Sequence, residues 1–347
     1  MNDTARVSVN IVAWNSMAYL SALLKSLEEQ TEPHRIIIVD NASTDGLHRF
    51  LSDRPDIATL RNMRNFGFSR AHNQAIQLAL SFWKESDLNN RYILVCNPDI
   101  EMHPQLLSEL VSFMDNHPEI DACAPKLLRA YLKMDDMDQI QTERTMILDA
   151  AGMSMTRSRR AYDRGAGEPD RGQYDSIVEV FGISGACSFF RASSLVKIAP
   201  DGQVYDEDFH AYKEDVDLAW RMKRLGLKSA LFPSAVAWHH RAAPSAPGAG
   251  ALLAFLRRGK KPAFTNYLST RNHTWMLVKN LSGSDLLFHG LWILPYEAGK
   301  FLAAFASAAS LRGYWDALLG LPKILQKRKL LKQKSRLTPK DFRKRVV

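Results

Sequence analysis

The first 125 residues alternate between short apolar runs and longer stretches with helical spacing. The run Arg35–Val39, RIIIV, is continuously apolar after its first residue, which is typical of a strand buried on both faces. The segment Ala18–Gln30 instead repeats its leucines at helical spacing. By the same criteria the predicted strands are Val7–Ala13, Arg35–Val39, Ala58–Leu60 and Tyr92–Cys96, and the predicted helices are Ala18–Gln30, Ser69–Lys84 and Pro104–Asn116. Strands separated by helices predict an α/β fold with a mostly parallel, Rossmann-like sheet between layers of helices.

The pattern weakens in the middle of the chain and returns as helix at its end. Residues 126–177 are polar and only weakly periodic, so we expect a long loop region there. The later predictions are a strand pair in Ile177–Arg191, a helix over Glu214–Leu225, a strand over Ser229–Trp238, a loop over Ala242–Gly250 and helices beyond residue 262. We therefore expect one α/β domain over residues 1–250 and a helical C-terminal region over residues 251–347.

Composition excludes several classes of protein. Apolar residues make up 46% of the 347 residues and charged residues 24%, which excludes a disordered chain and a collagen-like fibre. The three cysteines, Cys96, Cys123 and Cys187, lack CxxC spacing. This argues against a disulfide framework and a structural zinc site, and favours small buried residues in a reducing compartment. The N-terminus lacks the pattern of a signal peptide, so none is expected.

The basic charge of the chain is concentrated at its end. The net charge is +9, but Lys323–Val347 alone carries +10. The apolar stretch Leu286–Leu311 precedes it and is interrupted by Glu297 and Lys300. We therefore expect two shorter helices that lie on a membrane or pack in a core, not a spanning helix. Interfacial aromatics beside a basic segment favour an anionic membrane surface over nucleic acid, for which no recognition motif is present, although a solvated tail stays open.

Four polar segments follow predicted strands, where parallel α/β sheets bind their ligands. They are VDNASTDG at 39–46, RNFGFSRAHN at 64–73, CNPD at 96–99 and YKEDVDLAWR at 212–221, and a fifth strand ends in His239 and His240. Each has a plain structural alternative as a turn, a helix cap or a hydrogen-bonded histidine. Asp215 and Asp217 lie about 200° apart on a helix, so one can face a cleft while the other makes a structural contact.

The order and spacing of these segments resemble the family 2 glycosyltransferases, which have the GT-A fold. The matching blocks are VSVNIVAWNS, IIIVDNASTDG, NFGFSRAHNQA, YILVCNPDIEM, FGISGACSFFR and AYKEDVDLAWRMKRLG, and they cover about residues 6–245. Within the family, the chain looks most like the bacterial rhamnosyltransferases that build cell-surface polysaccharides.

The resemblance implies a role for each matching position. For the nucleotide-sugar it implies Ala13, Asn15, Asp40, Asp45, Asn65, Gly67, Arg70, Asn73 and Asn97, with Asp40 at the base. For the metal it implies Asp99 and His239, with His240 as the alternative histidine; Asn97 replaces the first carboxylate of the family's Asp-x-Asp motif. For the acceptor side it implies Gly185, Ala186 and Trp220. Asp215 is implied as the catalytic base, with Glu214 beside it.

The resemblance also implies a reaction. An inverting glycosyltransferase with Mg²⁺ or Mn²⁺ would move a sugar from a nucleotide-sugar, dTDP-rhamnose in the subgroup, to a hydroxyl of a polyprenyl-diphosphate-linked glycan. It would work in the cytoplasm, peripherally on the inner face of the cell membrane; the oligomeric state stays open. From the glycines and prolines of the loop Ala242–Gly250, we expect this loop to act as a lid over the donor. One alternative is a transferase that uses another donor, such as a UDP-sugar. The other is a protein that binds a nucleotide-sugar without catalysis. A sugar-1-phosphate nucleotidyltransferase is disfavoured, because the loop AWNSMAYL lacks the glycine-rich, arginine-containing sequence that such an enzyme needs.

Overall fold

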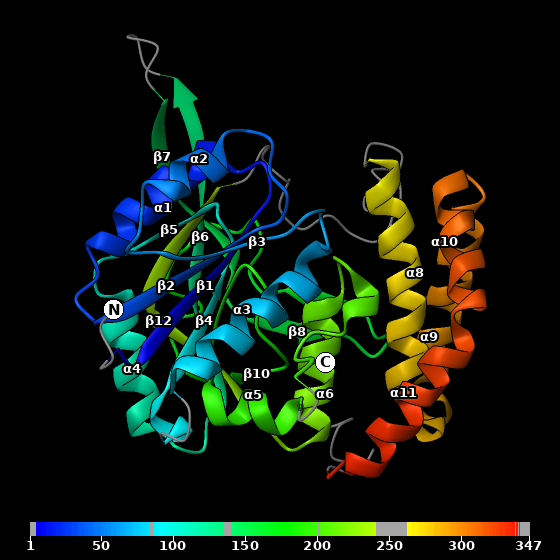
Figure 1. Cartoon of the computed structure of the whole chain (residues 1–347). Helices are drawn as coiled ribbons and strands as arrows, with labels where there is room; N and C mark the ends of the chain where they lie inside the picture. Colours follow the sequence, from blue (N-terminus) through cyan, green and yellow to red (C-terminus); the bar gives the residue numbers. More distant parts are fainter. Residues whose placement is uncertain are drawn as a thin grey trace.

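A twisted β-sheet with helices on both faces forms the N-terminal part of the molecule, and the C-terminal helices stand beside it as a further layer (Figure 1). The computed structural model describes residues 5–83, 87–134, 140–199, 202–240, 262–336, 338 and 340. The α/β fold that we expected is confirmed. The proposed lid, Ala242–Gly250, lies outside the described residues.

The main sheet is parallel in one half and mixed in the other. Its order is β10-β12-β6-β11-β4-β1-β2-β3, with β5 on β12 and β7 on β6. The strands are β1 Val7–Ala13, β2 His34–Asp40, β3 Ala58–Arg61, β4 Tyr92–Cys96, β5 Ile100–Met102, β6 Ala122–Met134, β7 Ile140–Ala150, β10 Val178–Val180, β11 Cys187–Arg191 and β12 Ser229–His240; β8 Met153–Met155 and β9 Ala161–Asp163 pair separately. β11 is antiparallel to both β4 and β6, which ends the parallel half. The register of β12 on β6 shifts between Phe232 and Val236.

The helices divide between the two faces of the sheet. The helical elements are α1 Met17–Glu28, α2 Leu47–Ser52, α3 Gly67–Trp83, α4 Leu106–Asn116, α5 Ala192–Ile198, α6 Glu214–Arg224, α8 Ala263–Asn280, α9 Gly283–Ala304, α10 Ala308–Leu319 and α11 Leu321–Lys334, with short 3-10 turns η1 Leu88–Asn90 and η2 Glu207–Phe209. The leucines of α1 and α4 pack on one face of the sheet, and apolar residues of α3, α5 and α6 pack on the other. Ile37 and Ile38 of β2 point to opposite faces, which explains the continuous apolar run. All three cysteines are buried and unpaired.

The expectation of a loop over residues 126–177 is wrong. β6 and β7 form a long antiparallel pair, and β8 and β9 follow it. Lys126 lies inside β6 with its Nζ 2.9 Å from Asp170 Oδ2, and Arg129 places its Nε 3.5 Å from Asp149 Oδ1. These charged residues are paired in the interior and not solvated, so polarity along the sequence was a misleading sign of a loop.

The expectation of two short helices in Leu286–Leu311 is also wrong in its boundary. α9 continues through Glu297 and Lys300, and the break falls at residues 305–307. Glu297 Oε1 lies 2.7 Å from His273 Nε2 of α8, and Lys300 lies 4.0 Å from the same carboxylate. The two charges therefore turn inward to partners and do not end the helix. Within the described ranges, no helix has the length and apolar character needed to cross a bilayer.

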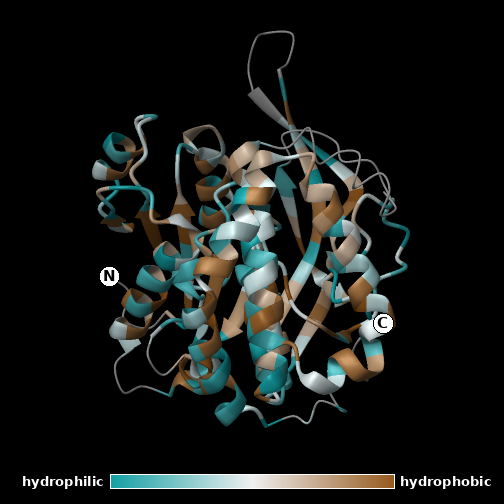
Figure 2. Ribbon diagram, turned by 90° about the vertical axis from the view of Figure 1, so that its right-hand side faces the viewer, coloured by the Kyte–Doolittle hydropathy of each residue, from teal (hydrophilic) through white to brown (hydrophobic). Residues whose placement is uncertain are grey.

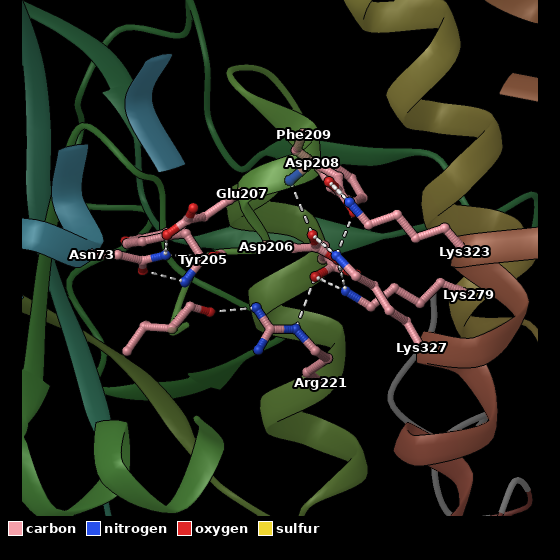
Figure 3. A network of polar contacts seen from close by, with 12 residues as sticks. Asn73, Tyr205, Asp206, Glu207, Asp208, Phe209, Arg221, Lys279, Lys323 and Lys327 are labelled. Carbon is pink, nitrogen blue, oxygen red and sulfur yellow. Dashed lines mark hydrogen bonds and ion pairs between the residues drawn. The ribbon is translucent and has the colours of Figure 1, made fainter. Parts of the chain in front are cut away.

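Buried ion pairs attach the C-terminal helices to the α/β domain (Figure 3). Lys279 of α8 places its Nζ 2.6 Å from Asp206 Oδ2 and 2.8 Å from Asp217 Oδ2. Lys327 of α11 pairs with Asp206 and Asp208, and Lys323 pairs with Asp208. Burial raises the pKa of Asp206, but the two lysines outweigh it and hold that pKa well below its usual range. Part of the basic C-terminal charge is thus used inside the molecule.

Replacement of Lys279 tests the strength of this attachment. In Lys279→Ala, two carboxylates that are almost fully buried lose a partner, so we expect the free energy of unfolding to fall by about 3 kcal/mol. The control Lys323→Ala removes a lysine that is 64% exposed, and should cost less than about 1 kcal/mol. Urea denaturation measures both values. If both variants lose the same unfolding free energy, burial of the ion pair does not determine how much it stabilises the protein.

Candidate active site

The loops that follow β1 and β2 are tied together by their polar side chains. Thr44 donates its backbone N–H to Asn15 Oδ1 at 2.8 Å, and Met17, the first residue of α1, donates to Asp45 Oδ2 at 2.8 Å. Asp45 thus serves as a cap for α1. Asp40 is fully buried next to the buried end of β1 at Ala13, and its Oδ1 accepts the N–H of Ser43 at 2.8 Å. Its Oδ2 lies 3.5 Å from Arg61 Nε and accepts no hydrogen bond from a described residue.

The turn that begins α3 lies next to the loops that follow β1 and β2. Asn65 Oδ1 accepts hydrogen bonds from Gly67 N and Asn41 Nδ2, both at 2.8 Å. Gly67 has φ +80°, and a Cβ there would lie 2.5 Å from His210, so only glycine fits. Arg70 is half exposed over the ring of Phe66, with its guanidinium carbon 4.2 Å from the ring centre.

Asn73 faces away from the turn at Asn65–Gly67, toward the segment before α6. It is buried, and its side chain exchanges hydrogen bonds of 2.8 and 2.9 Å with the backbone of Tyr205. Figure 3 shows this pair beside the ion-pair network. Asn73 therefore joins α3 to the segment that precedes α6, which is a structural contact.

Asp99 and His239 meet at the end of β12. His239 Nε2 lies 3.3 Å from Asp99 Oδ1, and its Nδ1 lies 2.7 Å from Asp149 Oδ2 on β7. Burial lowers the pKa of His239, but hydrogen bonds and charges from Asp149 and Asp99 outweigh it and raise that pKa to about 9. His240 points to the other side of the strand, with its Nε2 2.8 Å from Glu101 Oε1. Strand alternation thus decides which histidine faces Asp99.

Asp99 and His239 are a donor set that fits a hard divalent metal. Asp149 accepts the proton on His239 Nδ1, so Nε2, which faces Asp99, is the nitrogen that could coordinate once a metal ion displaces its proton. Among the residues that the structure describes, no three His, Cys, Asp or Glu side chains form a closed metal cage. Two protein ligands suit an ion such as Mg²⁺, which is commonly held by few carboxylates together with substrate phosphates.

Gly185 and Ala186 connect the Asp99–His239 pair to the start of α6. Asn97 donates its backbone N–H to Ala186 O at 2.9 Å. A Cβ on the adjacent Gly185 would lie 3.5 Å from Asp215 Cβ and 3.3 Å from Phe68 Cζ, so Gly185 lies between those two residues. Trp220 is not brought to this place, because it is fully buried in the cluster that joins α6 to α8.

The carboxylates of α6 diverge, as helical geometry predicts. Asp217 points to Lys279 and Arg221 and is fully buried, whereas Asp215 is half-buried beside Gly185. Glu214 is buried, and burial together with the neighbouring charge of Asp215 raises its pKa to about 8. Glu214 is therefore mostly protonated at neutral pH, next to Asp215.

Asp149 is the site residue that the sequence reasoning missed. It lies on β7, inside the region where we expected a loop, and it is almost fully buried between His239 and Arg129. Its local sequence, ILDAAG, carries no motif. The pairing of β6 with β7 brings it to His239 and Asp99.

The raised pKa of Glu214 predicts a dependence of stability on pH. Between its ordinary pKa of 4.5 and about 8, the unfolded chain releases this proton while the folded chain keeps it. Stability therefore falls as the pH rises through this window. Glu214→Gln removes the effect. The unfolding free energy of the variant, measured relative to that of wild type, should therefore increase from pH 5 to pH 8. The exposed control Glu143→Gln should follow wild type throughout. Parallel curves for Glu214→Gln and wild type would contradict the buried, protonated state.

Comparison with known proteins supports the family that the sequence resembles. Residues 8–195 match Glycosyl transferase family 2. The chain is 29% identical over 251 residues to the N-acetylglucosaminyl-diphospho-decaprenol L-rhamnosyltransferase of Mycobacterium tuberculosis (strain ATCC 25618 / H37Rv). That match covers 67% of this chain and 75% of the relative.

Solved structures share the fold at low sequence identity. GalNAc-T7 with UDP, GalNAc and Mn²⁺ has a TM-score of 0.57 at 12% identity; the match covers 80% of this chain but only 48% of that one. S. aureus TarS 1–349 with UDP-GlcNAc has a TM-score of 0.50 at 15% identity, over 95% of this chain and 87% of TarS. Because the family match spans more than half of the chain, and the fold is that of GT-A enzymes, this protein belongs to glycosyl transferase family 2 and is a glycosyltransferase.

Proposed function

We propose that this enzyme transfers a sugar, with inversion, from a nucleotide-sugar to a hydroxyl of a glycan carried on a polyprenyl diphosphate. One observation carries the proposal. Asp215 packs against Gly185, and the next residue, Ala186, is hydrogen-bonded to the strand end that leads to Asp99. Two contacts thus connect a candidate base to the segment that carries a candidate diphosphate-side carboxylate, which supports a single-displacement transfer at this place.

The chain's own residues account for the two ends of the reaction. We assign the nucleotide to Asp40 and Asn15; the assignment is supported by the Asp40 oxygen that accepts no hydrogen bond from a described residue and by the contact of Asn15 with the neighbouring loop. Asp215 takes the proton of the acceptor hydroxyl while that oxygen forms its bond to the anomeric carbon. The bond from the anomeric carbon to the diphosphate breaks at the opposite face, and the nucleoside diphosphate leaves with the electron pair. Because Glu214 is protonated, it places no second negative charge beside the base.

Asp99 and His239 would hold the divalent metal. When it is bound there, Mg²⁺ or Mn²⁺ supplies Lewis-acid neutralisation of the leaving diphosphate. Asp149 orients His239 for this role through the 2.7 Å contact. The Mn²⁺ in GalNAc-T7 supports the use of such an ion in this fold.

The mycobacterial relative supports a specific donor and acceptor. Its name describes a rhamnosyl transfer to N-acetylglucosaminyl-diphospho-decaprenol. We therefore propose dTDP-rhamnose as the donor and a polyprenyl-linked sugar as the acceptor, at the inner face of the cell membrane. The UDP and UDP-GlcNAc in the TarS structure keep a UDP-sugar as the second donor to test.

The C-terminal helices support contact with a membrane. The outward side of α9 is apolar: Leu287, Leu291, Leu294, Leu302 and Phe305 are 79%, 86%, 62%, 69% and 63% exposed, and they recur at helical spacing. Its charged residues turn inward instead, which reverses the usual pattern of a surface helix. Trp315, Leu318 and Leu319 of α10 are also exposed. Figure 2 views the molecule from the side of the C-terminal helices, where brown, apolar turns lie between teal, hydrophilic ones.

A bilayer fits this apolar face better than a second copy of the chain does. The strongly basic end of the chain follows directly after α10. It would be attracted to an anionic leaflet, whereas two copies would bring like charges together. Lipid-linked acceptors also lie at such a surface, so the membrane contact and the acceptor support each other.

Activity of the purified protein tests the reaction. With dTDP-rhamnose, Mg²⁺ and a lipid-diphosphate-GlcNAc acceptor, we expect nucleoside diphosphate release and product formation by wild type. Asp215→Asn should lower the transfer rate by at least about 100-fold, the usual range for loss of a general base. The exposed control Asp53→Asn should keep it. Tight donor binding without turnover on any acceptor would indicate a non-catalytic binder, and turnover of a UDP-sugar alone would correct the donor.

Flotation with vesicles tests the membrane contact. We expect wild type to float with phosphatidylglycerol vesicles and less with neutral ones. Leu291→Glu should weaken partition by about tenfold or more, because it removes an apolar side chain from the contact. Val196→Glu on α5, also exposed, is the matched control. Equal flotation of Leu291→Glu and wild type would exclude the α9 face, and a concentration-dependent dimer that Leu291→Glu abolishes would assign this face to a second copy.

A further inference from the structure

The loop between η2 and α6 has a costly backbone conformation. His210 has φ 62° and ψ −69°, and Ala211 donates its N–H to Phe209 O at 2.7 Å. This is a classic γ-turn, a rare and strained conformation. Tyr212 and Lys213 follow with φ 70° and 72°, also in the left-handed region without being glycine. Such strain persists only where the surrounding structure holds it.

A buried asparagine of α8 holds this loop. Asn272 is fully buried, and its Nδ2 lies 2.7, 2.8 and 2.8 Å from the carbonyl oxygens of Phe209, Ala211 and Tyr212, which share its two N–H groups. The neighbouring Arg271 donates from Nη2 to Asp208 O at 2.9 Å. Arg271 also donates from Nε to Asn272 Oδ1 at 3.0 Å, so the two side chains support each other. Two consecutive residues of α8 thus supply donors to the loop along most of its length.

The loop in turn contacts both sides of the candidate active site. His210 O accepts the N–H of Ser69 in the first turn of α3, and His210 fills the space that a side chain on Gly67 would occupy. At its other end, Lys213 begins α6, and its carbonyl accepts the N–H of Asp217 at 2.9 Å. Asp215 lies between these two residues in the first turn of α6. The loop therefore connects the turn at Gly67, the start of α6 and α8.

We propose that Asn272 is a positioning residue for catalysis: it holds the strained loop 209–213 and so sets Asp215 relative to the Gly67 turn. The inference rests on the proposed function of Asp215 as the base. It makes α8 a component of the active site, in addition to any role of the C-terminal helices at a membrane. Arg271 assists by holding the beginning of the same loop.

Asn272→Asp is the sharpest test, because it keeps the size of the side chain and removes its N–H donors. We expect kcat for transfer to fall about tenfold or more, with the donor KM changed less than threefold. Amide hydrogen exchange in residues 209–217 should become faster in the same variant. The control Thr274→Val lies two residues on, and its hydroxyl bonds only to Thr270 O within α8. It should match wild type in both measurements.

A second variant and the exchange data keep the inference testable. If Asn272→Asp does not fold, Arg271→Met at a partly exposed position should give a smaller change in the same direction. If wild type transfers no sugar at all, the proposed function fails, while hydrogen exchange still decides whether Asn272 holds the loop. Wild-type kcat together with wild-type exchange in a folded Asn272→Asp would overturn the inference. A loss of donor affinity with unchanged kcat would also overturn it.

Discussion

The sharing of Lys279 between two buried carboxylates is the interaction on which the arrangement of this enzyme depends. Asp206 and Asp217 lie before and within α6, and each would be strongly disfavoured in the interior without a cation. Arg221 and Lys327 each pair with one of them, but the cation that both share comes from α8, in a different layer of the molecule. Separation of the two layers would therefore leave the carboxylates of Asp206 and Asp217 without the Lys279 ammonium group. Because Asp217 is committed to this structural task, Asp215 is the carboxylate of this helix that is left for chemistry.

The site is built from contacts of two kinds. Main-chain carbonyls and side-chain amides define the shape of the loops, as in the exchange between Asn41 and Asn65. Buried carboxylates orient the groups that would react, as Asp149 does for His239. Neutral amides are suited to the first task because they donate and accept without adding charge. The second needs charge, which explains why the acidic residues gather around the ends of β4, β7 and β12.

Much of this could be predicted from local sequence, and the parts that could not share a cause. Apolar runs such as Arg35–Val39 and the leucine spacing of α1 follow local rules, so those elements agree with the structure. The divergence of Asp215 and Asp217 follows from helical geometry alone. β6 was missed because Lys126 and Arg129 find partners more than fifteen residues away. The same holds for Glu297, whose partner is on α8, and for Asp149. In each case a charge that looks solvated in the sequence is neutralised by a distant residue.

The register irregularity in β12 has a consequence for which histidine faces Asp99. Phe232 pairs with Pro125, but Val236 already pairs with Lys126, so β12 carries three more residues than β6 over this interval. Side chains alternate along a strand, so the parity of this insertion determines which face each later residue takes. Within this family, a change of one residue in the length of the irregular segment would exchange the two histidines. An imidazole would still face Asp99 after such a change, but it would belong to the neighbouring residue.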